Sequence, residues 1–217
     1  MKKQVVDSLV FSFPKDFQVV KYDELESYKR LGSSMQFKCE CEKCPSRTCS
    51  SSGKGCDSQD KCHRRRQNEG LKGVDLVATD TSALYLIEAK DYRKNEKPPT
   101  SHIVDEVAKK FRDTLFGIWC GSHCEGDKAT RQFLHLARTR PHQLAFIFHF
   151  ESPLTLYPSG FYRKNLSEQR GKVVGLTTVC ELLRKKLGPM GDYVNVVDMD
   201  YLSHEGSQQY RWTVRDH

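Results

Sequence analysis

The sequence predicts an α/β fold, a mixed β-sheet flanked by helices, with a cysteine-rich insertion. Three observations lead to this prediction: an apolar hairpin pattern near residue 80, helical patterns on both sides of it, and a strongly apolar strand over Gln143–Leu154. The predicted order is helix, cysteine insertion, hairpin, helix, strand, helix, strand, which suits a sheet covered by helices. The 217 residues are enough for a single domain over 1–217 with a sizeable core.

The hairpin is predicted over Gly73–Arg93, whose sequence is GVDLVATDTSALYLIEAKDYR. Two runs rich in β-branched and aromatic residues are separated by Thr79–Ser82, a segment of turn-forming side chains. Asp75 lies on the first predicted strand, and Glu88 and Lys90 lie on the second. Because side chains alternate along a strand, Glu88 and Lys90 project from the same face. Buried charges without partners are costly, so this pair indicates a site more than a packing role.

Helical periodicity predicts a helix on each side of the hairpin. The first covers Lys21–Ser33, where tyrosine and leucine recur at three-residue spacing. The second covers Val104–Gly121, with apolar residues along one face. The remaining predicted elements are a polar basic loop, a helix and two strands: Tyr157–Lys172, Thr177–Leu187, Tyr193–Asp200 and Tyr210–Val214.

The spacing of Asp75, Glu88 and Lys90 resembles the active-site motif of the PD-(D/E)XK nuclease superfamily, which has the restriction-endonuclease-like fold. The resemblance implies that Asp75 and Glu88 bind Mg²⁺ or Mn²⁺, with the Ala89 carbonyl as a further ligand. It also implies that Lys90 positions or activates the attacking water. Carboxylates suit this task because the metal they collect neutralises the phosphate and lowers the pKa of bound water. Val74 stands where the superfamily has proline. The alternative is an ordinary hairpin with a surface Glu–Lys pair.

The superfamily also places a carboxylate on the helix before the hairpin. Asp23, Glu24 and Glu26 are the candidates here, and we expect Glu24 to be the one that joins the catalytic set. The helix dipole, which favours acidic residues in a first turn, explains these residues equally well.

Two segments, EAKDYR at Glu88–Arg93 and EVAKKFRDTL at Glu106–Leu115, resemble a bacterial, defence-type subgroup of these nucleases. This resemblance implies a nuclease of prokaryotic defence and a possible partner protein from the same defence system. Within the second segment, Lys110 either reaches the phosphate or is simply solvated.

The second strong feature is the cysteine-rich segment, residues 37–66. It has almost no apolar residues after Phe37, so it has no core to hold it together. Thiolates bound to one structural Zn²⁺, or to two that share thiolates, would cross-link it. Disulfides in an oxidising compartment, or an iron–sulfur cluster, are the alternatives. The candidate ligands are Cys39, Cys41, Cys44, Cys49, Cys56, Cys62 and His63.

A second, weaker metal candidate is the Cys120–Cys124 segment, which also contains His123. No fourth ligand is evident there, and free cysteines are common at the end of a packed helix.

The formal net charge of +7 favours a polyanionic partner, DNA more than RNA. Five basic residues flank the hairpin and are candidates for phosphate contacts: Arg64, Arg65, Arg66, Arg93 and Lys94. The alternative for each is a solvated surface position.

Taken together, these patterns predict a Mg²⁺-dependent endonuclease that hydrolyses phosphodiester bonds. Two alternatives remain: a nucleic-acid-binding module that no longer cuts, and a subunit that is active only within a larger complex. The amino terminus lacks the sustained apolar run of a signal peptide, and no segment reaches transmembrane length. We therefore expect a cytoplasmic protein with no membrane partner.

Overall fold

The computed structural model of the protein describes residues 1–34, 71–93, 100–121, 128–139, 143–151, 166–204 and 209–217. The cysteine-rich segment lies outside the described residues, and so do Arg64, Arg65, Arg66, Lys94, His123 and Cys124. In the described part of the chain, no helix combines the length and the apolar character that a bilayer crossing requires.

A five-stranded mixed sheet forms the centre of the molecule. Its strands are β3 (Gln18–Lys21), β4 (Leu76–Thr79), β5 (Ala83–Asp91), β6 (Gln143–Glu151) and β7 (Tyr193–Val197), in that spatial order. The first three strands pair antiparallel, whereas β5, β6 and β7 pair parallel. The long β6 is buried on both faces over most of its length, as expected of a strand inside such a sheet.

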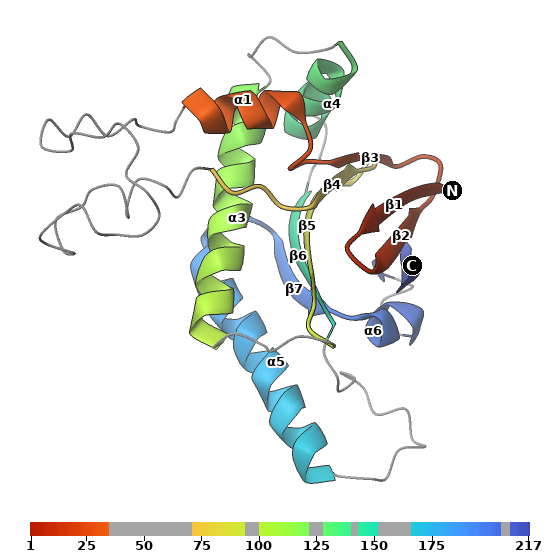
Figure 1. The fold of residues 1–217 in the computed structure, drawn as a ribbon, viewed down its shortest axis with the longest axis vertical. Coiled ribbons are helices and arrows are strands. Elements are labelled where there is room, and N and C mark those ends of the chain that lie inside the picture. The colour runs from red at the N-terminus through yellow and green to blue at the C-terminus, as the bar shows by residue number, and fades with distance from the viewer. Residues whose placement is uncertain (35–70, 94–99, 122–127, 140–142, 152–165, 205–208) are drawn as a thin grey trace, which may run out of the picture.

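Helices cover one face of this sheet (Figure 1). They are α1 (Glu26–Ser34), α3 (Thr100–Gly121), α4 (Lys128–Thr139) and α5 (Leu166–Leu187). One apolar core joins α3, α4 and α5 to strands β4–β7 and to Tyr22. Phe146, Phe148 and Phe150 of β6 point into this core, since alternate residues of a strand share a face.

The opposite face packs against a three-stranded antiparallel sheet and a short helix (Figure 1). The sheet has the order β1 (Lys2–Val6), β2 (Leu9–Phe13), β8 (Thr213–Asp216), and the helix is α6 (Met199–His204). A second core fills this side, with Trp212 and the phenylalanines of β2 at its centre. The turn between β1 and β2 contains Asp7 at a φ of 50°, a conformation that aspartate tolerates better than most residues.

The predicted mixed sheet and its flanking helices are confirmed, but several boundaries are wrong. The first helix begins at Glu26 instead of Lys21, because Lys21 still pairs with Leu76 in the sheet. The helix expected from Thr177 begins at Leu166. The strand expected to reach Asp200 ends at Val197, because Asp198 caps α6 by accepting a 2.7 Å hydrogen bond from the Tyr201 amide.

Candidate active site

Glu88 is the most unusual residue of the described core. It lies on β5 opposite Phe148 of β6, facing the helical layer, and its side chain is 0% exposed. Its Oε1 atom is 2.6 Å from Lys110 Nζ and 3.2 Å from Lys90 Nζ, whereas its Oε2 atom has no hydrogen-bond partner. A buried carboxylate oxygen without a partner is costly, so it marks a position built for something other than packing.

Asp75 lies beside Glu88 because of the register of the hairpin. Leu76 pairs with Ile87 in the antiparallel ladder, so the next position places Asp75 opposite Glu88. Asp75 precedes β4 by one residue, whereas the sequence predicted it on the strand itself. Its Oδ2 atom accepts a 2.7 Å hydrogen bond from the amide of Ala89. Two carboxylates therefore meet at the end of the hairpin.

Two lysines from different elements converge on Glu88. Lys90 comes from the same strand, two residues further along, as the sequence predicted. Lys110 comes from α3 and is 14% exposed, compared with 28% for Lys90. Of the two expectations for Lys110, the solvated position is therefore wrong, and the structure directs its ammonium group into the site.

Hydrogen bonds to the backbone hold the segments of the site together. Thr114 of α3 is fully buried. Its hydroxyl accepts a 2.9 Å bond from the Val74 amide and donates a 2.8 Å bond to the Lys110 carbonyl. The Tyr22 amide donates a 3.0 Å bond to the carbonyl of Asp75. The segment before α1, the lead into β4 and the middle of α3 are thus fixed relative to one another.

Of the three carboxylates on the amino-terminal side, Asp23 is the one whose pKa responds to the charges of this site, whereas the expected Glu24 is paired with Lys21. Glu24 is 62% exposed and forms an ion pair of 2.9 Å with Lys21, while Glu26 pairs with Arg30 on the surface of α1. Asp23 is also exposed, yet partial desolvation and then the negative charge of Asp75 raise its pKa. The positive charge of Lys110 opposes this rise. Of the three candidates, Asp23 is therefore the one whose pKa is affected by the charges of Asp75 and Lys110.

Burial controls the protonation of the site. Desolvation, and then the charge of Asp75, raise the pKa of Glu88 from 4.5 to about 7, although Lys110 and Lys90 oppose the rise. Burial by itself would lower the pKa of Lys90, but the carboxylates of Glu88 and Asp75 raise it above its ordinary value. Lys90 therefore stays protonated over the physiological range, and Glu88 is the residue that titrates near neutrality.

The donor set fits a divalent cation. Glu88 Oε2 lacks a partner, Asp75 supplies a second carboxylate, and a bound cation would remove the repulsion that raises the pKa of Glu88. Within the described ranges, no three Asp, Glu, His or Cys side chains gather closely enough to form a metal site by themselves. Mg²⁺ does not require three, since it keeps several waters and is commonly held by one or two carboxylates and the substrate phosphate. The role of the Ala89 carbonyl stays a prediction.

Arg93, expected to contact phosphate, is engaged by carboxylates instead. Its guanidinium forms bonds of 2.9 Å and 2.6 Å to the two oxygens of Asp91 and lies 2.6 Å from Asp216 of β8. These contacts lower the pKa of Asp91 well below its ordinary value. They link the end of β5 to the carboxy-terminal strand, which favours a structural role for Arg93. The predicted roles of Arg64, Arg65, Arg66 and Lys94 lie outside the described residues, as do those of the cysteine ligands and His63.

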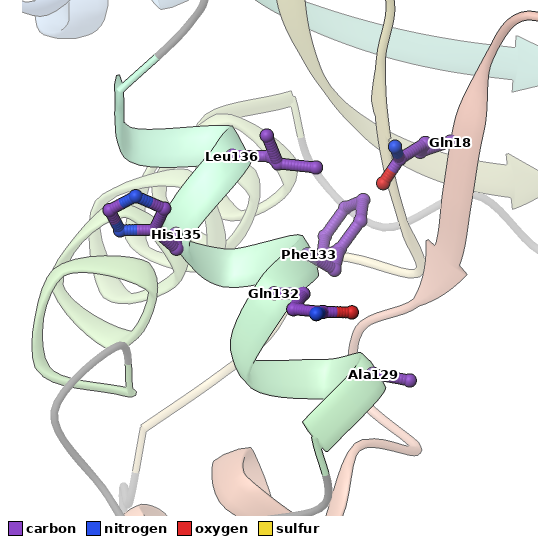
Figure 2. Close-up of a pocket in the computed structure, with 6 residues that line it drawn as sticks. All are labelled: Gln18, Ala129, Gln132, Phe133, His135 and Leu136. Carbon is purple, nitrogen blue, oxygen red and sulfur yellow. The ribbon is translucent and has the colours of Figure 1, made fainter.

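A pocket of about 410 Å³ lies apart from these residues, between β3 and α4. Gln18 and Phe133 point toward each other across it, and His135 also contributes to its lining (Figure 2). The remaining lining residues are Ala129, Gln132 and Leu136, so the pocket contains no carboxylate or lysine for chemistry.

Comparisons with known proteins find a partial similarity and no family. No protein-family profile matches the chain, and no solved structure matches it. A similar curated protein is the cysteine–tRNA ligase of Neisseria meningitidis serogroup A, which is 29% identical over 180 residues. The match covers 78% of this chain and 24% of the ligase, so the chain spans about a quarter of the length of that relative.

Proposed function

We propose that this protein is a metal-dependent nuclease that hydrolyses phosphodiester bonds of nucleic acid, with DNA as the preferred substrate. The observation that carries the proposal is Glu88, which is wholly buried, has one unpartnered oxygen, and lies beside Asp75 and two lysines. A carboxylate pair that can hold a cation, with adjacent ammonium groups that can stabilise negative charge, suits phosphoryl chemistry.

Each residue has a distinct part in this proposal. Asp75 and Glu88, with the Ala89 carbonyl, would hold Mg²⁺, and Asp23 would add charge from the segment before α1. The bound cation would neutralise the phosphate and lower the pKa of a water molecule. Lys90 stays protonated and orients the attacking water or stabilises the developing negative charge. Lys110 holds Glu88 Oε1 at 2.6 Å, so it orients the carboxylate and keeps its other oxygen directed to the site.

The finer fold assignment belongs to the same proposal. Three antiparallel strands, then α3 and α4, then the parallel strand β6 support a restriction-endonuclease-like core. A zinc-bound cysteine-rich insertion and a role in prokaryotic defence rest on the sequence patterns alone.

Cleavage assays with matched variants test this function. Purified protein is incubated with supercoiled, linear and single-stranded DNA and with RNA, in Mg²⁺, Mn²⁺ or EDTA. We expect cleavage that requires the metal and falls at least about 100-fold in Glu88→Gln and Asp75→Asn, because each removes ligand charge. Lys185→Gln on α5, an exposed position remote in sequence from the hairpin, serves as the control and should keep wild-type activity. Undiminished cleavage by Glu88→Gln would show that the site is wrongly assigned.

A nucleic-acid-binding module without cleavage is the second candidate. The similarity to a cysteine–tRNA ligase favours it, since that protein's name gives tRNA as its substrate and this chain resembles about a quarter of it. In this case the protein would bind tRNA with or without metal and would leave every nucleic acid intact. If cleavage appears only after a partner protein is added, the chain is a subunit of a larger nuclease.

A further inference from the structure

Helix α4 carries a row of basic side chains along its outer side. Lys128, Arg131, His135 and Arg138 are spaced three, four and three residues apart, which places them on one face of a helix. No acidic residue occurs anywhere in Lys128–Thr139. The other side of the helix buries Phe133, Leu134 and Ala137 in the core. The row is therefore fixed on a rigid element and has no acidic neighbour within its own helix.

Exposed aromatic rings on α3 continue this surface. Trp119 is 63% exposed, and the guanidinium of Arg138 lies 5.2 Å from its ring centroid. Phe116 is 44% exposed, and it precedes Trp119 by three residues on the same helix. Arg112 precedes Phe116 by four residues, which places it on the same face of the helix, and it is exposed as well. By contrast, the second tryptophan of the chain, Trp212, is only 1% exposed and belongs to the core.

These residues are not explained by folding. A solvated basic helix face is ordinary, but two large rings held in water beside that face are not, because their burial would be favourable. The basic row is suited to a polyanion, and the exposed indole offers a flat apolar surface for stacking. Single-stranded nucleic acid combines both features, since its phosphates are anionic and its unpaired bases are available to stack.

We propose that this α3–α4 surface, defined by Arg112, Phe116, Trp119, Lys128, Arg131, His135 and Arg138, binds single-stranded nucleic acid. An unpaired base stacks on Trp119, and the phosphates on either side contact the cations of α4. The inference rests on the proposed nucleic-acid function and adds the strandedness of the bound segment to it.

The surface is separate from the Glu88 site. Trp119 follows Lys110 by nine residues on α3, which corresponds to about 14 Å along the helix axis and half a revolution around it. Binding at Trp119 can therefore be measured without disturbing the carboxylates and lysines of the site.

Tryptophan fluorescence provides a direct test, since Trp119 is exposed and Trp212 is buried. The measurement uses full-length Glu88→Gln protein in EDTA, so that no substrate is cut. Titration with a single-stranded thymidine oligonucleotide should quench the emission of Trp119. Trp119→Phe should bind with similar affinity but lose the quenching, because phenylalanine still offers a stacking surface. Trp119→Ala should weaken binding about tenfold or more, as measured by fluorescence anisotropy of a labelled oligonucleotide.

Charge variants test the phosphate contacts. Lys128→Gln with Arg131→Gln should reduce the slope of log affinity against log salt by up to about 1.4, which is about 0.7 for each single-strand contact. Lys185→Gln with Lys186→Gln on α5 removes the same charge elsewhere and should leave the slope unchanged.

The inference would be overturned by no quenching, by unaltered affinity in Trp119→Ala, or by stronger binding of duplex than of single strands. Equal binding of inorganic polyphosphate would exclude stacking and would likewise overturn it. The cleavage assay is independent of these readouts, so metal-dependent cutting without quenching would remove this inference and leave the proposed function intact. Quenching without any cutting would leave this inference intact and remove the proposed nuclease activity.

Discussion

Glu88 shows how one residue can depend on its neighbours for its charge. Its side chain is 0% exposed, and only Oε1 has partners. In the ionised state, the charge is balanced by Lys110 and Lys90 but opposed by Asp75 and by the loss of water. The outcome is a carboxyl group whose pKa rises to about 7, so a neutral form is accessible at physiological pH.

This raised pKa predicts a particular dependence of stability on pH. Between pH 4.5 and about 7, the folded state binds more protons at Glu88 than the unfolded state does. The contribution of Glu88 to the free energy of unfolding must therefore fall as the pH rises through this window. At about 1.4 kcal/mol for each pH unit, the loss approaches 3 kcal/mol. In EDTA, the difference in free energy of unfolding between wild type and Glu88→Gln should change by up to that amount from pH 4.5 to 7.5. Urea denaturation at several pH values measures this difference, and parallel pH profiles for the two proteins would contradict the prediction.

The choice between Asp23 and Glu24 can be decided by metal binding. The structure records the charge interaction of Asp23 with Asp75, whereas Glu24 is paired with Lys21 at the surface. We expect Asp23→Asn to weaken Mn²⁺ binding several-fold and Glu24→Gln to leave it unchanged, as measured by isothermal titration calorimetry. The two variants remove the same charge from adjacent positions, so each is the control for the other. A larger effect of Glu24→Gln than of Asp23→Asn would instead support Glu24, the residue expected from the sequence.

At the scale of elements, helix α3 connects the site to the core. Its inner face supplies Lys110 and Thr114 to the site, and one turn further on it accommodates Tyr22. Gly117 makes room for that tyrosine, since a Cβ at this position would lie 2.1 Å from the Tyr22 hydroxyl oxygen. Tyr22 in turn precedes Asp23 and binds the backbone of Asp75. The close packing of Gly117 against Tyr22 thus helps to set the positions of Asp23 and Asp75.

Gly117→Ala should therefore destabilise the protein, although alanine is the better helix former. The gain of about 1 kcal/mol in helix propensity is opposed by an overpacking cost of about 1–3 kcal/mol, because the ring of Tyr22 is fully buried. We expect a net loss of up to about 2 kcal/mol by urea denaturation, together with weaker metal binding.

Gly32→Ala in α1 is the matched control, since nothing lies within 4 Å of its added Cβ. That variant should be neutral or more stable by up to about 1 kcal/mol. Equal effects at both glycines would show that the contact with Tyr22 does not limit the substitution.

At the scale of the whole molecule, the prediction that most needs testing is zinc in the cysteine-rich segment, residues 37–66. Protein purified without added metal should contain at least one zinc per chain by elemental analysis. Cys41→Ser and Cys44→Ser should lower that ratio, because the segment has no apolar core to replace the metal. Cys180→Ser is the control: Cys180 lies on α5 as a free thiol, with its sulfur 3.7 Å from the Val194 carbonyl. Zinc-free protein with paired cysteines would establish disulfides instead.

Local patterns were enough to predict the hairpin and the two site residues on its second strand. Alternation and turn chemistry act over a few residues, so the placement of Glu88 and Lys90 on one face followed directly. The start of the first helix was predicted wrongly because pairing of Lys21 with Leu76 joins segments 55 residues apart. The resulting shift of the helix start to Glu26 leaves Asp23 and Glu24 in the turn before α1. The sequence analysis did not predict the hairpin of β1 and β2 or helix α4. Their residue patterns are short, and these elements are recognised only from the surfaces on which they pack.

The sequence by itself determined the α/β class, the apolar strands and the hairpin that brings Asp75, Glu88 and Lys90 together, because these depend on periodicity and spacing along the chain. Only the tertiary structure decided which other groups join that site. Lys110 reaches Glu88 because α3 packs across β5. Tyr22, the neighbour of Asp23, bonds to the backbone of Asp75. The same is true of the surface formed by α3 and α4, where Trp119 and Arg138 meet although 19 residues separate them. Such contacts depend on how helices pack on a shared core, which no local pattern of residues specifies.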